Sequence, residues 1–576
     1  MLILGLSAFE RNPAALLFNH GVVEAAVEEN KLTRSSAHGV PHAAIRYCFA
    51  KTAVGWDELD FVAVAARPLR AWMRKSLWRA RQALSFPLDG LYHGAKELGT
   101  LSREWNNSRS LADTGGIPSS KLLNFEHHLC HGAAAFYSSP FDRSLILTLD
   151  EEGDGWSGLL AVGEGTQIRI LQPIPFPHSL GWVYSQVTAL LGFVPQHDEH
   201  KLQWLSLEGE PLYSSVFIDM LRASRGPFPS LNLSFFNGGR KSGIAFSDKF
   251  YQRVGVGKGN QISGEQRAAL ASSLQDACAR VVGDLIEDYR RREGVGNICL
   301  GGGLFENTLL VADLEKRLGG SVFVPPAPGN SGCALGAAYL AWHQKLKQGR
   351  TPPISNVYWG PKYSRQEIKD VLDNCKAKYS LHYTELEKLD AVVRLLEAGK
   401  IVAWYQGATE FGSRALGNRS LLASPWADYV KENLNDYVKH REWYRPFALA
   451  VPAEDCPRFF ECSELSSFMT SLGRARSTSD EKLRSFFLPG DRVRVHVVKQ
   501  QSNPLFWRLL KRFGERAPAP ILVNTSFNLF GEPLVVSPRD AVRSYWCSGI
   551  DAMMLDNFLL RKHNGSIGEG AACPST

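Results

Sequence analysis

Three histidines lie within the segment EHHLCH, at the start of an alanine-rich run. His127 and His131 are four residues apart, so on a helix their imidazoles project from one face, close enough to bind a single ion. His128 points elsewhere on such a helix, and we expect it to be structural. Asp150 ends the apolar run LILTLD and is the best candidate for a third ligand. Two imidazoles and a carboxylate, with no thiolate, suit Fe(II), Mn(II) or Zn(II).

The HxxxH spacing also fits histidines that cap a helix or pack in a core, because such histidines are common without an ion. The aspartate at a predicted strand end favours the metal interpretation. On the spacing alone, both interpretations stay open.

Glycine-rich turns lie near the ends of several predicted strands and helices. They are Gly5 with Ser7, GDG at 153–155, GGG at 301–303 and GNSGCALG at 329–336. Glycines let backbone amides approach phosphate oxygens, so four such turns predict a nucleotide cleft between two lobes. We assign to this cleft Gly302, Gly303, Asn307 and Gly332. Tight-turn geometry alone is the alternative for one or two of the turns.

Basic residues gather beside glycines and prolines in the loops of the C-terminal region. Arginine forks match phosphate and carboxylate oxygens, so these loops predict a site for a triphosphate and a second small anion. Glu410 and Glu442 are candidate ion-pair partners that would fix the forks, and a surface ion-pair network is the alternative. The residues concerned are Arg414, Arg419, Lys439, Arg441, Arg445 and Arg494, with Asn524 and Ser526 directly after a predicted strand.

The elements that must position these residues alternate between strands and helices, which predicts an α/β architecture. Segments 2–5 and 20–28 suggest a hairpin-linked start, and 61–66, 145–150, 158–165 and 297–303 read as further strands, with helices at 266–290 and 332–347. The segment 349–358, GRTPPISNVY, is a predicted linker. We therefore expect two domains, 1–350 and 351–576, the second with a helix at 386–398 and strands at 401–407 and 521–524.

Composition places the chain among soluble globular proteins. It has 576 residues, 44% hydrophobic and 21% charged, and a net charge of +7 that is a weak argument for a polyanionic partner. None of the 10 cysteines forms a CxxC motif, which favours reduced thiols in a cytoplasmic protein. The N-terminus does not resemble a signal peptide, and no apolar run is long enough for a membrane helix. The basic, amphipathic segment 67–84 predicts a helix that covers the core, with contact to a membrane surface or an anionic acceptor as the alternative.

Motifs in order along nearly the whole chain resemble the O-carbamoyltransferases of antibiotic and nodulation-factor biosynthesis. They are EHHLCHGAAAFYSS, LILTLDEEGDGWSG, GGGLFEN, GNSGCALGAA, EFGSRALGNRSLLASP, VKHREWYRPFA and ILVNTSFNLFGEPLVVSPRDAV. The resemblance implies an N-terminal domain similar to the tRNA threonylcarbamoyl transferase, with an actin/hexokinase-like duplicated core. It also implies a smaller C-terminal α/β domain similar to threonylcarbamoyl-adenylate synthase.

The implied chemistry has two steps. The C-terminal site makes carbamoyl-adenylate from carbamoyl phosphate and ATP, and the N-terminal site transfers the carbamoyl group to an acceptor hydroxyl and releases AMP. By position, the resemblance implies His127, His131, Asp150 and Asn330 as ligands of Fe(II) or Mn(II), besides Mg(II) bound with ATP. It implies that carbamoyl phosphate and ATP contact Lys439, Arg445, Arg414, Arg494, Asn524 and Ser526.

Three positions depart from the family pattern. Asn330 stands where an aspartate is usual, which predicts weaker metal binding or a different metal. Arg11 stands where a histidine is common, and Ser36 where a lysine is common. Because the usual basic residues are altered there, His38 and Asp154 are our candidates for the general base.

Three other functions compete with this interpretation. A tRNA-modifying transferase would explain the N-terminal half, but no aromatic-studded basic RNA platform is visible and we expect no nucleic-acid partner. A non-haem iron oxygenase with a two-histidine, one-carboxylate triad leaves the arginine loops unexplained. A non-enzymatic nucleotide-binding regulator would bind ATP without consuming carbamoyl phosphate. The sequence does not identify the hydroxyl-bearing small-molecule acceptor.

Overall fold

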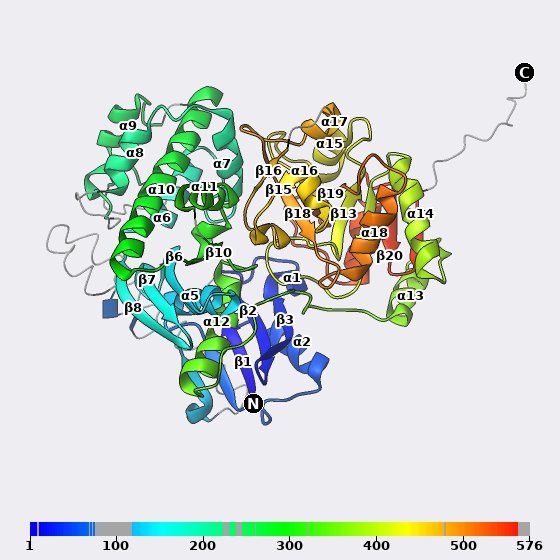
Figure 1. The fold of residues 1–576 in the computed structure, drawn as a ribbon, viewed down its shortest axis with the longest axis horizontal. Coiled ribbons are helices and arrows are strands. Elements are labelled where there is room, and N and C mark those ends of the chain that lie inside the picture. The colour runs from blue at the N-terminus through cyan, green and yellow to red at the C-terminus, as the bar shows by residue number, and fades with distance from the viewer. Residues whose placement is uncertain are drawn as a thin grey trace, which may run out of the picture.

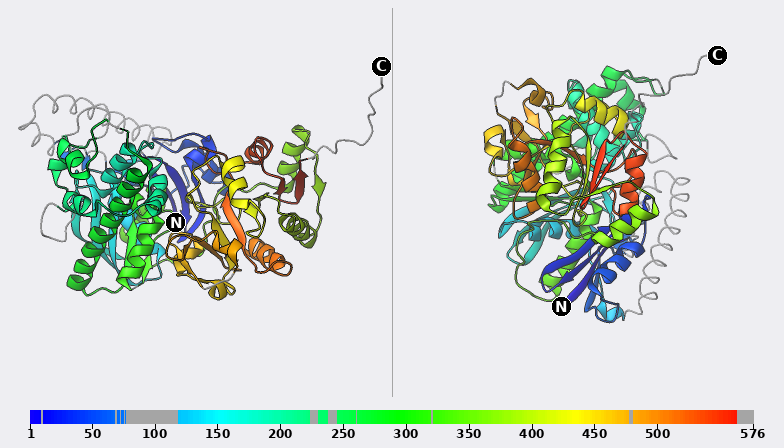
Figure 2. Two further views of the ribbon diagram at one scale, coloured as in Figure 1. Left: turned by 90° about the horizontal axis from the view of Figure 1, so that it is seen from above. Right: turned by 90° about the vertical axis from the view of Figure 1, so that its right-hand side faces the viewer.

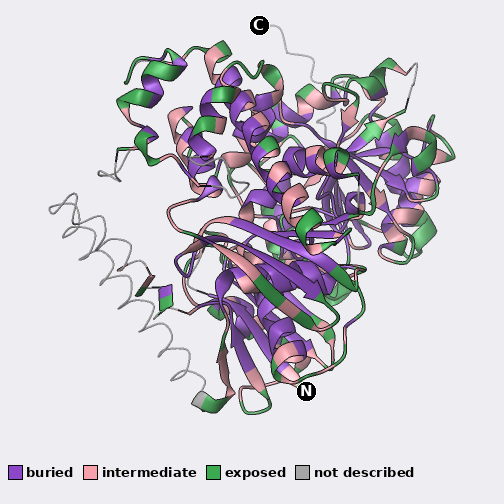
Figure 3. Ribbon diagram, turned by 60° about the vertical axis from the view of Figure 1, so that its left-hand side comes forward, coloured by how far each residue is buried: buried purple, intermediate pink, exposed green. Residues whose placement is uncertain are grey.

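The computed structural model describes residues 1–8, 11–67, 70–71, 73–74, 76, 118–222, 230–237, 245–259, 261–319, 321–476 and 480–562. Within these residues the chain forms an N-terminal and a C-terminal half that lie side by side (Figure 1). The left-hand view of Figure 2 shows the same arrangement from above. Buried residues are concentrated in the sheets and in the helices packed on them (Figure 3).

The described part of the N-terminal half contains two five-stranded sheets with the same strand order. In each, three successive strands pair antiparallel, and the first of them also pairs in parallel with a fourth, which pairs in parallel with a fifth. The predicted duplicated α/β core is therefore confirmed. In chain order the strands are β1 (Leu2–Ser7), β2 (Ala14–Asn19), β3 (Val22–Glu28), β4 (Phe61–Val64) and β5 (Leu122–Asn124), then β6 (Arg143–Gly153), β7 (Trp156–Glu164), β8 (Gln167–Pro175), β9 (Ile298–Gly301) and β10 (Val322–Phe323).

The start of the chain differs from the prediction. Segments 2–5 and 20–28 do not pair directly, because β2 lies between β1 and β3 and pairs with both. Five of the six residues of β2 are buried, so its sequence AALLFN lacks the alternation of a half-exposed strand. That missing alternation is why the sequence pattern did not reveal it.

Two helices pack against each other between the two sheets. Helix α5 (His127–Ser138) lies on β6 and β9, and α12 (Cys333–Tyr339) lies on β1. The packing of α12 requires glycine on two sides. On the sheet side, a Cβ on Gly5 of β1 would stand 2.2 Å from the Ala334 carbonyl oxygen. A Cβ on Gly336 would stand 1.9 Å from the Cys130 carbonyl oxygen. The histidine-bearing helix and the start of α12 are therefore neighbours.

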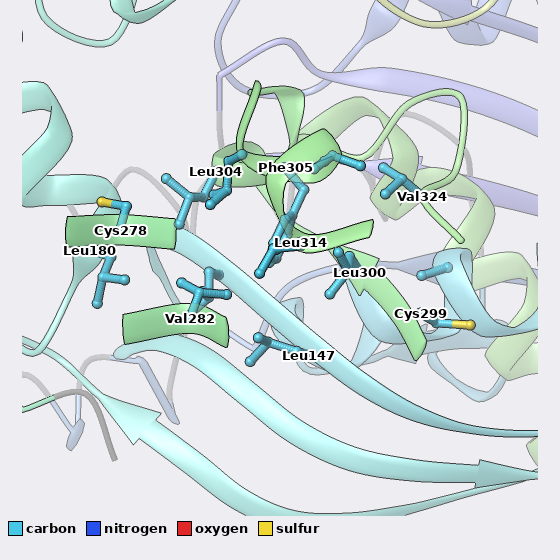
Figure 4. Close-up of a cluster of buried hydrophobic side chains, with 14 of the residues drawn as sticks. Leu147, Leu180, Cys278, Val282, Cys299, Leu300, Leu304, Phe305, Leu314 and Val324 are labelled. Carbon is cyan, nitrogen blue, oxygen red and sulfur yellow. The ribbon is translucent and has the colours of Figure 1, made fainter. Parts of the chain in front are cut away.

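The second sheet is covered by the long helix α10 (Gly264–Glu293) and by α11 (Thr308–Leu318). Helix α10 begins with a capping box, in which Ser263 and Gln266 satisfy each other's backbone amides. Figure 4 shows Leu147 of β6 and Leu300 of β9 packed with Val282 of α10 and Leu314 of α11. This apolar layer holds the ends of β6 and β9, where the candidate site lies.

The C-terminal half is built on a mixed sheet whose described strands follow the order β11-β21-β20-β12-β13-β19-β14-β18. Helices α14 (Glu385–Glu397) and α18 (Pro504–Gly514) cover one face, while α13 (Arg365–Asn374) and α19 (Pro538–Trp546) cover the other. The strands are β11 (Ser380–Leu381), β12 (Val402–Tyr405), β13 (Arg419–Ala423), β14 (Ala448–Pro452), β18 (Val495–Val498), β19 (Leu522–Ser526), β20 (Ala552–Leu555) and β21 (Phe558–Arg561).

Shorter elements complete the two halves. A three-stranded sheet, β15-β16-β17, lies beside the large sheet. The elements are α1 (Glu29–Thr33), α2 (His42–Thr52), α6 (Leu180–Leu190), α7 (Glu199–Leu205), α8 (Ser214–Leu221), α9 (Asp248–Val254), α15 (Val430–Glu432), α16 (Cys456–Phe459), α17 (Glu481–Arg484), β15 (Phe460–Glu461), β16 (Gly473–Ala475) and β17 (Arg492–Val493).

Most of the basic segment 67–84 lies outside the described residues. In its described part, Arg74 donates to the Asp154 carbonyl oxygen at 2.8 Å, and its guanidinium lies 3.9 Å from the centre of the Trp156 ring. Arg74 belongs to the basic face of the predicted helix, whereas Met73 of its apolar face is exposed, so these described residues do not follow the predicted division into a core-covering and a solvent-facing side. Across the described part of the chain, we find no helix with the length and apolar character that a membrane crossing requires.

Candidate metal cluster and buried cation site

The two predicted metal-binding histidines face each other on α5. Their Nε2 atoms are 3.0 Å apart, and the Asp150 Oδ2 atom lies 3.1 Å from that of His131 and 3.9 Å from that of His127. Both imidazoles are buried. Two ring nitrogens and a carboxylate oxygen that converge in this way form three sides of a cation site. The structure thus brings together the three ligands that the HxxxH spacing and the strand end predicted.

The N-terminus of α5 is held in place by carboxylates. Glu126 caps the helix by accepting a hydrogen bond from the Leu129 amide at 2.9 Å. Asp154 accepts from the His127 amide, also at 2.9 Å. Gly153 lies flat against the His127 ring, where a Cβ would stand 2.1 Å from its Cδ2 atom. The first turn of the helix, and with it the His127 side chain, is thereby fixed against the end of β6.

Asp150 is oriented by its neighbours and stays ionised. Its Oδ1 atom accepts a hydrogen bond from the Glu151 amide at 2.7 Å, which leaves Oδ2 facing the histidines. Burial alone would raise the pKa of Asp150, but the hydrogen bonds to His127 and His131 outweigh it and hold the pKa well below its usual value. A carboxylate anion therefore faces the two rings.

His128 does not join the cluster, as predicted. One ring nitrogen lies 3.1 Å from the Thr148 hydroxyl and the other 3.0 Å from the Trp156 carbonyl oxygen. The ring therefore donates to the carbonyl and accepts from the hydroxyl, and burial lowers its pKa well below the usual value. His128 is a neutral packing residue that ties α5 to β6 and β7.

Two further residues from the GNSGC turn border the cluster. Asn330 belongs to the short helix Asn330–Gly332, which packs on α5, and its side-chain oxygen is buried with no hydrogen-bond partner among the described residues. The Cys333 sulfur, one ring nitrogen of His127 and one ring nitrogen of His131 all lie within 4.8 Å of one another. The histidines, Asp150 and a buried amide oxygen suit a divalent cation, so the residues fit the predicted metal. A cysteine sulfur therefore lies beside the predicted ligands, which the spacing of histidines and carboxylates did not indicate.

The two candidate general bases occupy different surroundings. The carboxylate of Asp154 accepts from the amides of Arg67 and His127, and burial raises its pKa. In this structure Asp154 therefore holds the backbone at Arg67 and at the first turn of α5. His38 is exposed and forms a backbone bridge with Arg11, whose guanidinium donates to the Gln196 carbonyl oxygen at 2.8 Å.

Near that pair lies an acid that the sequence pattern did not single out. Glu151 accepts from the Gln196 side-chain amide at 2.7 Å, and burial raises its pKa to about 7. Ser36 lies exposed after α1. Gln196 thus links Arg11 to Glu151, and His38 joins Arg11 through the backbone bridge.

The glycines of the GGG turn lie beside the metal cluster. Gly302 adopts φ +95°, and a Cβ there would stand 2.2 Å from the Leu149 carbonyl oxygen. A Cβ on Gly303 would stand 3.0 Å from Asp150 Oδ1. Gly332 serves a tight turn, because its Cβ would stand 1.9 Å from the Ala327 carbonyl oxygen.

Asn307 has a structural role in this structure. Its Oδ1 atom caps α11 by accepting from the Leu310 amide, and its side-chain amide donates to Gln275 at 2.8 Å. These contacts hold the turn after β9 in place. They occupy the polar groups that we expected to meet a nucleotide.

The predicted cations of the C-terminal half converge at neighbouring strand ends. Asn524 of β19 pairs with Ala448 of β14. The Leu449 amide of β14 donates to the carbonyl oxygen of Arg494, which precedes β18, at 2.9 Å. The ends of β14, β18 and β19 therefore lie side by side. Lys439 ends the π-helix Asn433–Lys439, and its loop leads to β14. The cluster, called the cation cluster below, consists of Arg414, Lys439, Arg441, Arg445 and Arg494.

Repulsion within the cation cluster is strong. The pKa of Arg494 is lowered well below its usual value by burial, and then by Arg414, Arg441 and Arg445. Burial and Arg445 lower the pKa of Arg441, and Glu442 raises it in part, so that the pKa is about 9. Arg445 lies 3.6 Å from Glu442, which Lys201 of the other half also contacts at 3.0 Å. Among the described residues, the carboxylates that act on these cations are those of Glu442, Glu306 and Asp198, which are fewer than the five cations, so the cluster is poised to bind an anion.

Lys439 lies deepest in the cation cluster. It is buried and donates to Asn528 Oδ1 at 2.7 Å and to the Asn528 carbonyl oxygen at 3.1 Å. It also contacts Ser526, whose hydroxyl donates to Asn528 Oδ1. Burial first, and then Arg441 and Arg445, lower its pKa well below the usual value. Residues of the NTSFN motif thus accept the hydrogen bonds of the Lys439 ammonium group.

Two predicted members of the basic site are placed elsewhere. Arg419 begins β13, and its buried side chain donates to the Gln406 carbonyl oxygen at 2.7 Å and stacks on Tyr405. Glu410 does not form an ion pair with any arginine that the structure describes, and its Oε1 atom accepts from the amides of Leu416 and Asn418. Both residues therefore shape the loop that carries Arg414.

The two candidate sites adjoin at Glu306, which the sequence pattern did not single out. Arg414 donates to the Glu306 carbonyl oxygen at 3.1 Å. Burial raises the pKa of the Glu306 carboxyl, while Arg414 lowers it and Asp150 raises it. Glu306 lies in the GGGLFEN motif, so its place within a glycine turn was the available signal.

Comparison with known proteins identifies the family. The model of the "Carbamoyltransferase N-terminus" matches residues 2–339, and that of the "Carbamoyltransferase C-terminus" matches 393–562. Nodulation protein NolNO of Sinorhizobium fredii is 31% identical over 97% of this chain and 80% of its own length. The 3'-hydroxymethylcephem-O-carbamoyltransferase of Amycolatopsis lactamdurans is 33% identical over 42% of this chain and 45% of its own length.

Among solved structures, the Acidaminococcus fermentans (R)-2-hydroxyglutaryl-CoA dehydratase component A is 14% identical. It covers 60% of this chain and 100% of its own, with a TM-score of 0.33, a likeness too low to carry an argument. The matches of the two family models extend over both halves, including the metal cluster and the cation cluster. The chain is therefore an enzyme of the carbamoyltransferase family.

Proposed function

We propose that the chain makes carbamoyl-adenylate in its C-terminal half and transfers the carbamoyl group to a small-molecule hydroxyl in its N-terminal half. The observation that carries this proposal is the cation cluster, in which the cations outnumber the carboxylates near them among the described residues. Carbamoyl phosphate and ATP are both polyanions, and together they supply the missing negative charge. Each arginine offers two-point contacts to phosphoryl oxygens.

The first step activates the carbamoyl group. Water cleaves carbamoyl phosphate to carbamate and phosphate, and a carbamate oxygen then displaces pyrophosphate from the α-phosphorus of ATP, which binds as its Mg(II) complex. Lys439, Arg445 and Arg494 neutralise the charge that develops on the phosphoryl oxygens. Asn524 and Ser526 support this site from the end of β19.

The second step takes place beside the metal cluster. The acceptor hydroxyl oxygen attacks the carbamoyl carbon, its proton leaves, and AMP departs. His127, His131 and Asp150 would hold a divalent ion, which when bound acts as a Lewis acid on the carbamoyl or phosphate oxygen. Gly302 and Gly303 keep side chains away from this edge of the sheet, so the adenylate can approach the backbone.

Contacts between the halves support the order of the two steps. Arg414 of the cation cluster touches Glu306, which follows the glycine turn beside Asp150. An adenylate formed at the cation cluster therefore forms next to the place where it reacts. The name of the cephem relative includes a hydroxymethyl acceptor, which favours a hydroxyl-bearing small molecule here. Since both phosphorylated substrates are metabolites of the cytoplasm, we propose that compartment.

The first step can be tested without knowledge of the acceptor. The pure protein is incubated with ATP, Mg(II) and carbamoyl phosphate, and pyrophosphate release is followed. We expect release that requires carbamoyl phosphate, disappears in Lys439→Ala and persists in His127→Ala. Lys482→Ala is the matched control, because this exposed lysine pairs with Asp428 away from the cation cluster.

Release that is absent, or that does not depend on carbamoyl phosphate, would contradict the proposal. ATP binding without release would favour a nucleotide-binding regulator. Loss of release in His127→Ala would also contradict the division of labour between the two halves, provided that the variant is folded by circular dichroism.

A further inference from the structure

We propose that Cys333 is a thiolate ligand of the metal ion, together with His127, His131 and Asp150. This inference rests on the metal site of the proposed function. It adds a ligand that the spacing of histidines and carboxylates did not indicate. The cysteine comes from the turn at the start of α12, which packs against α5.

Geometry places the sulfur at the cluster. One ligand atom each of His127, His131 and Cys333 lies within 4.8 Å of the others. The Cys333 Sγ atom is 3.9 Å from the His127 carbonyl oxygen, in the first turn of α5. The Asp150 Oδ2 atom is 3.1 Å from the Nε2 atom of His131 and 3.9 Å from that of His127, so it borders the same pair of imidazoles. Binding of an ion requires the four donors to move to metal-ligand bond lengths of about 2.0–2.3 Å.

The glycines of the GNSGCALG motif fix the sulfur in this place. The Gly336 backbone touches the Cys130 carbonyl oxygen, so α12 cannot slide along α5. Gly332, directly before the cysteine, has no room for a Cβ. Cys333 itself is fully buried. Its sulfur is therefore held beside the histidines by backbone contacts that tolerate little displacement.

Charge also favours the thiolate. Two neutral imidazoles and the Asp150 carboxylate provide one negative charge, and the Asn330 amide adds none. When the thiol binds the ion it releases its proton to solvent, and the donor set then carries two negative charges, which balance a divalent cation. A sulfur ligand favours Zn(II) or Fe(II) and disfavours Mn(II), because Mn(II) prefers oxygen ligands.

The test uses metal alone. Metal-free protein is loaded with one equivalent of Co(II), and its near-ultraviolet spectrum is recorded. We expect a thiolate-to-cobalt charge-transfer band in the wild type, no band in Cys333→Ala or Cys333→Ser, and an unchanged band in Cys278→Ala. Cys278 is an equally buried cysteine within α10, which makes it a matched control.

X-ray absorption of the Zn(II)-loaded wild type checks the ligand directly and needs no variant that folds. We expect one sulfur at about 2.3 Å from the zinc, beside nitrogen and oxygen ligands near 2.0–2.2 Å. The Zn(II) affinity of Cys333→Ser should fall by about 10–100-fold, the loss that even outer-shell partners cause.

Co(II) that binds without the band, or a band that persists in Cys333→Ala, would overturn the inference and leave the histidine site standing. Failure to bind any metal would overturn the metal site with it. Pyrophosphate release from carbamoyl phosphate and ATP would still decide the proposed function separately.

Discussion

Individual residues of the cation cluster show how a binding site acts against the stability of the fold. Burial and three neighbouring arginines lower the pKa of Arg494. Its Nε atom is buried and has no hydrogen-bond partner among the described residues. Uncompensated charges of this kind destabilise the folded state until an anion binds. The same repulsion favours the binding of an anion at this site.

Replacing Arg494 by methionine should therefore stabilise the free protein and weaken anion binding. We expect the free energy of unfolding to rise by about 1 kcal/mol, as for other relieved functional sites. Added pyrophosphate should raise the Tm of the wild type by mass action and raise that of Arg494→Met less. Calorimetry with and without pyrophosphate measures both effects. Arg508→Met, which removes a surface arginine paired with Glu385, is the control. A variant that is less stable than wild type without anion would contradict this account.

His496 should make the protein sensitive to acid. It is buried, accepts a hydrogen bond from the Asn524 amide at 3.1 Å, and has a pKa lowered to about 3 by burial. In the unfolded chain a histidine has a pKa near 6.5. Between about pH 6.5 and 3, His496 is therefore protonated in the unfolded chain but neutral in the folded protein. The contribution of His496 to the free energy of unfolding is therefore fully present above pH 6.5 and is lost as the pH falls below it. His496→Gln retains an acceptor for Asn524 but does not titrate.

Urea denaturation at pH 7.5 and 5.5 measures the contribution of His496. Between these two values, the wild type should lose about 1.4 kcal/mol more unfolding free energy than His496→Gln. Equal losses in both proteins would show that His496 does not carry this pH dependence.

At the scale of elements, the sequence predicts what depends on local pattern. The four-residue spacing on α5 predicts that two histidines share a face, and the strand LILTLD predicts an aspartate at its end. The structure shows these three side chains within 3.9 Å of one another. Most strands and long helices follow from their apolar periodicity for the same reason.

What the sequence did not predict depends on contacts between distant elements. Cys333 reaches the histidines because α12 packs on α5, and no local pattern encodes that contact. Asn307 and Arg419 have the residue types of ligand-binding groups, but neighbouring elements use their polar atoms. Strand β2 was missed because burial on both faces removes alternation.

The contact of β6 with α5 should control the metal site. A Cβ on Gly153 would overlap the His127 ring, so Gly153→Ala should displace that ring and weaken Zn(II) binding by about 10–100-fold, as loss of an orienting contact does. Isothermal titration of metal-free protein with Zn(II) measures the change. Gly296→Ala is the control, because a Cβ there has nothing within 4 Å. Equal affinities in the two variants would show that Gly153 does not position His127.

In the whole molecule, charged side chains of the first sheet region tie the two halves together. Lys31 of α1 is buried and donates to the carbonyl oxygens of Glu410 and Gly412, each at 2.8 Å. Glu28 lies 2.9 Å from Lys31 and accepts from the Gly412 amide at 2.6 Å. The loop that these residues hold also carries Arg414 of the cation cluster. Stability and the alignment of the two sites therefore depend on one buried lysine.

Replacing Lys31 by methionine keeps the length of the side chain and removes its charge. Glu28 and two carbonyl oxygens would then lie buried without their partner, so the free energy of unfolding should fall by about 3–5 kcal/mol. We also expect the two halves to unfold at separate denaturant concentrations, because a buried connection between them is lost and the contacts that remain, such as Lys201 with Glu442, are more exposed. Guanidinium denaturation followed by tryptophan fluorescence and by circular dichroism measures both effects. Lys482→Met, which removes an exposed lysine paired with Asp428, should cost no more than about 1 kcal/mol. If the two variants lose the same stability and both unfold in one transition, Lys31 does not couple the halves.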